Sequence, residues 1–138
     1  MLGTDSHTCM GGAMGSFATG VGSTEMLGVL ITGKTWLRVP ETIQVIWDGN
    51  LKPGVMAKDI SLKTIGAIGH AGATYKTVEY QGSTISGLSM DERLAITNMA
   101  VEMGAKAGLM KPDEKVAEYL AQHGVTASYK MVESDPDA

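Results

Sequence analysis

The sequence of 138 residues has a single cysteine, a single phenylalanine and no long hydrophobic run. One cysteine excludes an internal disulfide and fits a reducing compartment, so we expect a cytoplasmic protein. No apolar stretch approaches the roughly 20 residues that a membrane-spanning helix needs. Met1 and Leu2 lead directly into a polar motif, which leaves no room for a signal peptide. We therefore expect no membrane partner.

Positive charge is also scarce. The chain has 11 lysines and arginines against 15 aspartates and glutamates, which gives a net charge of −4. A nucleic-acid-binding domain needs a basic face, so we expect no nucleic-acid partner. Arg38 and Arg93 are the only arginines, so a dianionic substrate would lack the usual bidentate partners within this chain.

Glycine and apolar residues, by contrast, are plentiful. Eighteen glycines indicate many tight turns and close backbone approaches, and a hydrophobic content of 43% can supply a core. The length suits one domain or a piece of a larger protein.

Hydrophobic periodicity and turn residues predict alternating helices and strands. We expect helices over 23–32, 56–68, 89–106 and 112–123, and strands over 34–39, 42–47, 74–81 and 125–131. Ser23 is predicted to cap the first helix, Ser89 and Glu92 to form a capping box on the third, and Pro112 to occupy the first position of the fourth. This alternation predicts an α/β layered fold.

The first dozen residues hold the densest group of chemically active side chains. Asp5, Ser6 and His7 stand in a row, and a glycine pair follows at 11–12. A histidine can give or take a proton near neutral pH, and such a run suits a loop at the carboxyl end of a strand. The alternative is a polar turn in which Asp5 and Ser6 bond their own backbone and cap the residues after them.

A second group lies on the predicted third helix. Asn98 and Glu102 are four residues apart, so they share one helix face. Spacing alone also fits an exposed polar stripe on a surface helix. Cys9 is interpreted as a small loop residue, and no metal site is predicted within this chain.

Short motifs spread from residue 3 to about residue 120 carry a resemblance to a known family. They are Gly3-Thr4-Asp5-Ser6-His7-Thr8, Gly11-Gly12, Phe17 to Glu25, Gly33 to Ile43, Lys58-Asp59, Gly72-Ala73-Thr74-Tyr75-Lys76, Leu88 to Asp91 and Asn98 to Lys106. In this order they resemble the aconitase superfamily, and within it the family of 3-isopropylmalate dehydratase large subunits.

The resemblance implies that the chain is an internal fragment of a longer subunit. Residues 1–39 would be the C-terminal part of the first aconitase-like domain, with the active-site loop and a helix. Residues 40–138 would be the second aconitase-like α/β domain, truncated at its end. A chain cut from a larger protein leaves apolar faces, so we expect an exposed apolar patch around 11–30, or self-association of the fragment that covers it.

The activity that the resemblance implies is reversible dehydration of a hydroxy-carboxylic acid. A 4Fe–4S cluster on three cysteines would act on the substrate as a Lewis acid. Asp5 and His7 would surround the departing hydroxyl, Ser6 would bind a substrate carboxylate, and Asn98 would lie near the cluster. Glu102 would hydrogen-bond His7 at roughly 2.6–3.2 Å, hold one tautomer of its ring and favour its protonated form.

The implied partner is a small subunit that carries a swivelling domain, and the preferred reaction is isomerisation of 2- and 3-isopropylmalate in leucine biosynthesis. Homoaconitase and dimethylmalate dehydratase large subunits are the alternatives, as is a non-catalytic remnant or assembly module of the same fold. Because only Cys9 could act as a thiolate ligand, we expect the fragment alone to bind no cluster and to be inactive.

Overall fold

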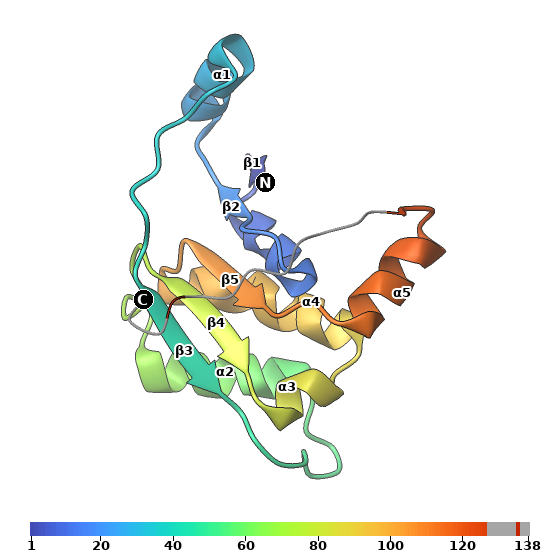
Figure 1. Ribbon diagram of the computed structural model, residues 1–138. Coiled ribbons are helices and arrows are strands. Elements are labelled where there is room, and N and C mark those ends of the chain that lie inside the picture. The colour runs from blue at the N-terminus through green and yellow to red at the C-terminus, as the bar shows by residue number, and fades with distance from the viewer. Residues whose placement is uncertain (127–134, 136–138) are drawn as a thin grey trace.

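The computed structural model describes residues 1–126 and 135, and it confirms the α/β class (Figure 1). Three parallel strands form the main sheet in the order β3-β4-β5, which are Thr42–Ile46, Thr77–Gln81 and Ala107–Met110. Helix α2, Ala57–Ile68, connects the first two strands. The second connection contains α3, α4 and the 3-10 helix η2, which are Ser83–Gly87, Met90–Asn98 and Met99–Met103. Helix α5, Glu114–Gln122, follows the sheet.

One face of the sheet packs on the helices to form the core. Val78 and Tyr80 of β4 are almost fully buried, and Ile43 and Val45 of β3 pack against the same cluster. Because these residues are two positions apart within each strand, they lie on the same side of it. Helix α2 contributes Ile60 to this core, and Ile65 and Ile68 pack against it, in agreement with the hydrophobic periodicity from which this helix was predicted.

Several predicted helix ends are confirmed, and others are wrong by a few residues. The Ser89 hydroxyl accepts the Glu92 N–H, and the Glu92 carboxylate accepts the Ser89 N–H at 2.8 Å, so the capping box is present. Gly22, not Ser23, is the N-cap of α1 (Ser23–Thr32), because the Glu25 carboxylate accepts the Gly22 N–H at 2.8 Å. Pro112 is not the first residue of α5, because Asp113 is the N-cap and its carboxylate accepts two backbone N–H groups of the first turn.

The predicted third helix is shorter than expected. Its α-helical part ends at Asn98 and tightens into η2, which Gly104 stops in the left-handed region at a φ of 79°. Residues 34–39 form no strand, because no neighbouring strand pairs with them in the described part of the chain. Strand β4 begins at 77 instead of 74. The strand expected over 125–131 falls outside the described residues except at 125–126, and these are not in a strand.

The N-terminal segment contains elements that the sequence did not predict. Strand β1, Leu2–Gly3, pairs in parallel with β2, Thr19–Gly20. Between them lies the 3-10 helix η1, Ser6–Met14, which lies against α4 and β5. A Cβ on Gly12 would stand 1.5 Å from the Gly108 carbonyl oxygen, so the close approach of η1 to β5 depends on this glycine.

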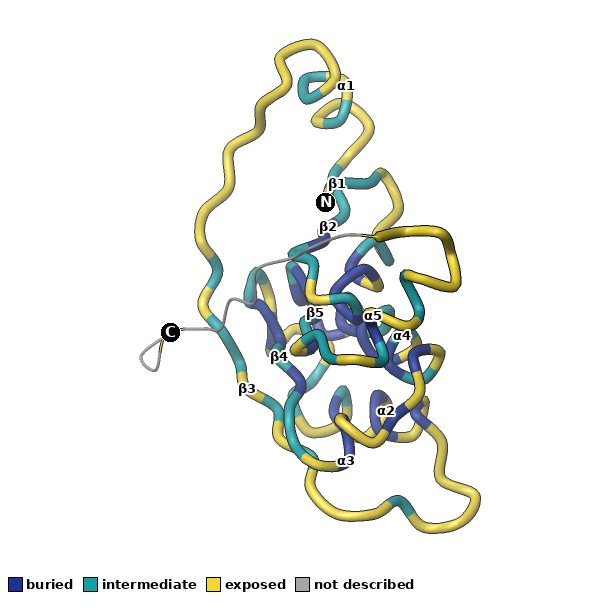
Figure 2. Tube along the Cα trace, turned by 45° about the vertical axis from the view of Figure 1, so that its right-hand side comes forward, coloured by how far each residue is buried: buried dark blue, intermediate teal, exposed yellow. Residues whose placement is uncertain are grey.

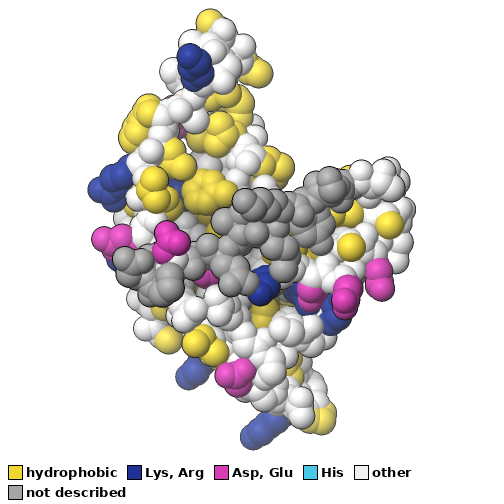
Figure 3. All heavy atoms as spheres, in the orientation of Figure 1, with side chains coloured by type: hydrophobic (Ala, Val, Ile, Leu, Met, Phe, Trp, Pro, Cys, Tyr) yellow, Lys and Arg dark blue, Asp and Glu magenta, His cyan; other side chains and the backbone are white. Residues whose placement is uncertain are grey.

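Helix α1 and the segment after it extend away from the core (Figures 1 and 2), and none of the helix residues is buried. The exposed apolar side chains here are Leu27, Leu30, Ile31, Trp36, Leu37 and Val39. Figure 3 shows apolar side chains gathered at this end of the molecule. The patch expected over 11–30 is therefore displaced, because residues 11–13 and 18–19 are buried and the exposed part runs from 27 to 39.

Among residues 1–126 and 135, no helix has the length and apolar character that crossing a membrane would require. The division into domains at residues 39 and 40 stays a prediction.

Candidate functional site

The Asp5-Ser6-His7 motif comes soon after strand β1, but Ser6 and His7 lie in the first turn of η1 and not in the loop that the sequence suggested. Asp5 is the N-cap of η1, and its Oδ1 accepts the His7 N–H at 2.6 Å. Its carbonyl oxygen accepts the Thr8 hydroxyl, also at 2.6 Å. The polar-turn interpretation is therefore right for Asp5, whereas the Ser6 hydroxyl contacts the His7 ring at 3.1 Å. The turn fixes the direction in which these side chains point.

Both nitrogens of the His7 ring have a partner. Nδ1 lies 3.1 Å from the Ser6 hydroxyl, and Nε2 lies 3.2 Å from Oε1 of Glu102. A neutral ring satisfies both contacts in one tautomer, in which Nε2–H donates to Glu102 and Nδ1 accepts the Ser6 hydroxyl. The contact predicted between residues 95 positions apart is thus present. The His7 and Glu102 side chains are 41% and 51% exposed, so a ligand can reach the pair from solvent.

Contacts between η1 and α4 hold the pair in place. Oγ1 of Thr97 lies 3.0 Å from the carbonyl oxygen of Met10, and Cys9 Sγ lies 3.4 Å from that of Asn98. Thr97 and Cys9 are almost fully buried. Asn98 is half-buried at the end of α4, and Glu102 is one turn further along in η2. The structure therefore brings the two predicted groups of site residues into one region.

A cavity of about 500 Å³ lies beside the loop. The residues that line it are Thr4, Ser6, residues 19–22 and 25, Thr74, Tyr75, Val101 and residues 104–106. Its volume suits a small organic ligand. Of the predicted site residues, Ser6 lines this cavity, whereas Asp5, His7, Asn98 and Glu102 are not among the residues that line it.

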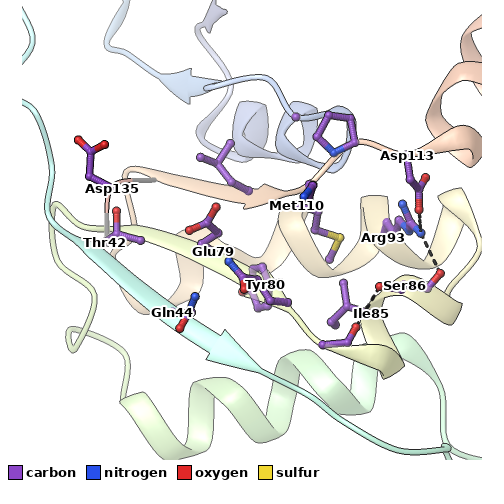
Figure 4. Close-up of a pocket in the computed structure, with 16 residues that line it drawn as sticks. Thr42, Gln44, Glu79, Tyr80, Ile85, Ser86, Arg93, Met110, Asp113 and Asp135 are labelled. Carbon is purple, nitrogen blue, oxygen red and sulfur yellow. Dashed lines mark hydrogen bonds and ion pairs between the residues drawn. The ribbon is translucent and has the colours of Figure 1, made fainter. Parts of the chain in front are cut away.

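A second cavity, of about 540 Å³, lies at the carboxyl ends of β4 and β5 and along the face of the sheet opposite the core (Figure 4). Its most buried polar side chain, Arg93, donates to the Ser86 carbonyl at 3.0 Å and to the Asp113 carboxylate at 2.6 Å. The Arg93 guanidinium lowers the pKa of the Asp113 carboxyl. We favour the cavity beside Ser6 as the site, because the arginine in this one is engaged in joining α3, α4 and α5.

The described residues do not fit a metal cluster as its ligands. No group of three or more His, Cys, Asp or Glu side chains in residues 1–126 and 135 could hold a metal ion. Cys9, predicted to lie in a loop, is buried in η1, and its burial raises the pKa of the thiol. A buried thiol held in its neutral form is a poor metal ligand.

Two residues beside the cavity were not predicted as site residues. Tyr75 is the one described residue other than glycine with a positive φ, 58°, and the Lys106 ammonium lies 5.6 Å from the centroid of its ring. Both residues fall within motifs that carry the family resemblance, so these motifs could have identified them as candidate site residues. No local pattern distinguishes them from surface residues.

The chain is similar to known proteins along its whole length. The family model "Aconitase family (aconitate hydratase)" matches residues 1–136. The chain is 52% identical to the 3-isopropylmalate dehydratase large subunit of Aquifex aeolicus over all 138 residues, which cover 32% of that protein. It is 51% identical over its whole length to a probable methanogen homoaconitase large subunit of Methanosarcina mazei, of which it covers 35%. The chain spans about a third of the length of these curated relatives, and the match to residues 1–136 shows that it belongs to the aconitase family.

Proposed function

We propose that this chain supplies the proton-donating part of the active site of a hydro-lyase large subunit, which reversibly dehydrates a hydroxy-carboxylic acid. The observation that carries the proposal is the His7–Glu102 contact of 3.2 Å, with Ser6 on the other ring nitrogen. Family membership supports the reaction class. Two segments 95 positions apart meet here at an imidazole, the side chain best suited to proton transfer near neutral pH.

The proposed roles follow from the positions of the side chains. In dehydration the C–O bond breaks, and the protonated His7 ring gives its Nδ1 proton to the departing hydroxyl, so that water leaves and the neutral ring keeps the Nε2 proton that faces Glu102. Glu102 orients the ring and stabilises its charged form when the proton returns in the reverse reaction. Asp5 stabilises the loop through the His7 N–H and lies beside the departing group.

The remaining roles concern the substrate and the environment of the reaction. The Ser6 hydroxyl binds a substrate carboxylate, since it lines the cavity beside the ring. Asn98 would lie near the 4Fe–4S cluster that the family implies for the complete subunit. The proton on the neighbouring carbon goes to a base outside this chain, on the small subunit with the swivelling domain that we propose as its partner.

We infer that the substrate is 2- or 3-isopropylmalate, in leucine biosynthesis and in the cytoplasm. The support is that the relatives from Aquifex aeolicus and Halothermothrix orenii, 52% and 53% identical, are named 3-isopropylmalate dehydratase large subunits. The second candidate is homoaconitate, because the relative from Methanosarcina mazei is 51% identical. Dimethylmalate, and a non-catalytic assembly module of the same fold, remain further alternatives.

A chimera tests the function. This chain would replace the corresponding third of the Aquifex aeolicus large subunit, to which it is 52% identical, and the product would be assembled with that enzyme's small subunit. We expect interconversion of 2- and 3-isopropylmalate, and its loss in a chimera with His7→Ala. A folded, cluster-containing chimera without activity would contradict the proposal, and preferential turnover of homoaconitate would favour the second candidate.

The aconitase family implies a 4Fe–4S cluster in a full-length subunit, and its cysteine ligands would lie outside this chain. We predict that the 138-residue chain alone forms no 4Fe–4S cluster and has no hydratase activity, because Cys9 is its single thiol. Anaerobic reconstitution with iron and sulfide, followed by the visible absorption spectrum and iron analysis, measures this. The chimera is the positive control, and a stoichiometric cluster with turnover on the isolated chain would refute the prediction.

We also predict that the isolated chain self-associates through α1 and the segment after it. Leu30 and Ile31 are 77% and 75% exposed, and contiguous apolar surface of this kind favours association. Sedimentation velocity over a range of concentrations should show oligomers that are reduced in the double variant Leu30→Glu and Ile31→Glu. Leu62→Glu, on the exposed side of α2, is the control. A monomer at all concentrations would count against the prediction.

A further inference from the structure

The geometry points to Lys106 as a second carboxylate-binding residue in the cavity beside Ser6, with Tyr75 as the residue that positions it. The cavity would then take a dicarboxylate, with one carboxylate on Ser6 and the other on the lysine. This inference rests on the proposed function for the choice of ligand class.

Backbone contacts fix the two residues side by side. The Tyr75 N–H donates to the Gly104 carbonyl at 3.0 Å, and the Lys106 N–H donates to the Lys76 carbonyl at 2.8 Å. These bonds join the turn before β4 to the turn before β5. Gly104 permits this contact, since a Cβ there would stand 3.0 Å from Oγ1 of Thr74. Tyr75 and Lys106 therefore line the same wall of the cavity.

Two cations lie within 6 Å of the centroid of the Tyr75 ring. The Lys106 ammonium lies 5.6 Å from the ring centroid, and the Arg38 guanidinium lies 4.8 Å from it. The backbone N–H of Arg38 also donates to the Tyr75 hydroxyl at 3.3 Å. A cation within about 6 Å of a ring face is attracted by the ring quadrupole. Because the ring carries no net charge, this attraction positions an ammonium without neutralising it.

Two other lysines, by contrast, have ammonium groups that are bonded to oxygen atoms of the chain. The Lys76 ammonium forms an ion pair with Glu41, and this bond lowers the pKa of the Glu41 carboxyl. The Lys115 ammonium donates to three carbonyl oxygens at 2.8–2.9 Å. Within the part of the chain that the structure describes, Lys106 has no carboxylate within 4.0 Å.

The one carboxylate that lines this cavity is already engaged. Glu25 accepts the Gly22 N–H at 2.8 Å, where it caps α1. The charge of Lys106 thus remains available to an anion that enters the cavity. Hydrogen bonds between ionised groups are the stronger kind, so this lysine would discriminate a second carboxylate from an uncharged group.

The backbone conformation of Tyr75 supports the positioning role proposed for its ring. A bulky side chain at a positive φ costs free energy, and glycine would adopt that conformation without strain. Here a tyrosine occupies it and contacts both cations. Tyr75→Gly therefore removes the ring without strain, which separates a positioning role from a role in folding.

The test is binding of malate, a 2-hydroxy dicarboxylate, to the 15N-labelled chain, followed by the amide shifts of Thr74, Tyr75, Ala105 and Lys106. We expect saturable shifts that weaken about tenfold in Lys106→Met, because a charge-assisted hydrogen bond is lost. Lys63→Met, an exposed lysine on α2, is the matched control and should bind like the unaltered chain. Dimethyl malate, which lacks the charges, should give no saturable shift.

Two further variants test the positioning. Tyr75→Phe keeps the ring and should bind malate normally, whereas Tyr75→Gly should bind it about threefold more weakly, since a cation–π contact is weaker than an ion pair. Equal affinity of the Lys106→Met variant and the unaltered chain, or no saturable shift at these amides, would overturn the inference. Because the assay measures binding without turnover, it can fail while the chimera is active, and it can succeed while the chimera is inactive.

Discussion

Replacing Gly12 with alanine is expected to destabilise the fold by about 3 kcal/mol or more. The new Cβ would lie 1.5 Å from the Gly108 carbonyl oxygen, and β5 cannot move away without losing its pairing with β4. Helix η1 would have to leave its place against β5. Since His7 is part of η1, the variant should also lose the His7–Glu102 contact. Urea unfolding followed by circular dichroism measures the loss of stability.

Gly28→Ala is the matched control for this substitution. Gly28 lies within α1, and a Cβ there would meet nothing within 4 Å. Alanine favours helix over glycine by up to about 1 kcal/mol, so this variant should be as stable as the unaltered chain or more stable. If Gly12→Ala unfolded at the same urea concentration as the control, the close packing of η1 on β5 would be wrong.

Replacing Glu102 with glutamine in the chimera is expected to lower kcat about 100-fold, the scale of general acid–base catalysis. Glutamine has the same size and can still accept a hydrogen bond from Nε2. It lacks the charge that stabilises the protonated ring, so it should impair proton transfer to the departing hydroxyl. KM should change by less than about threefold, because Glu102 is not proposed to bind the substrate. Steady-state kinetics with 3-isopropylmalate measure both constants.

Glu118→Gln removes the same charge from the exposed surface of α5 and serves as the control. It should leave both constants unchanged. If Glu102→Gln instead raised KM and left kcat unaltered, Glu102 would be a substrate-binding residue, and the proposed role of the pair would be wrong.

The elements predicted most accurately are those whose signals are local. The Ser89 capping box and the apolar face of α2 depend on residues within a turn or two of one another. Strand β5 was missed because Ala107–Met110 contains no β-branched or aromatic residue, and these are the residues enriched in strands. Residues 34–39 have strand-like composition but no partner strand in the described residues, so their backbone stays exposed.

The candidate site could likewise be predicted only in part from local sequence signals. The residue types at positions 5–7 and the spacing of Asn98 and Glu102 each left a structural alternative open. Periodicity cannot bring together residues 95 positions apart, and the pairing was inferred from the family resemblance. The structure supplies a physical reason for it, since Gly12 and Thr97 let η1 pack against β5 and α4. The position of Lys106 over Tyr75 depends on two turns that meet only in the folded chain.

The central claim is that Glu102 holds the His7 ring in one tautomer while Ser6 contacts its other nitrogen. Long-range 15N NMR of the histidine ring in the isolated chain tests this most directly, at a pH where the ring is neutral. We predict that Nε2 carries the proton and that Nδ1 does not, with this preference reduced in Glu102→Ala. A ring protonated on Nδ1 in the unaltered chain, or a tautomer preference that Glu102→Ala leaves unchanged, would contradict the account.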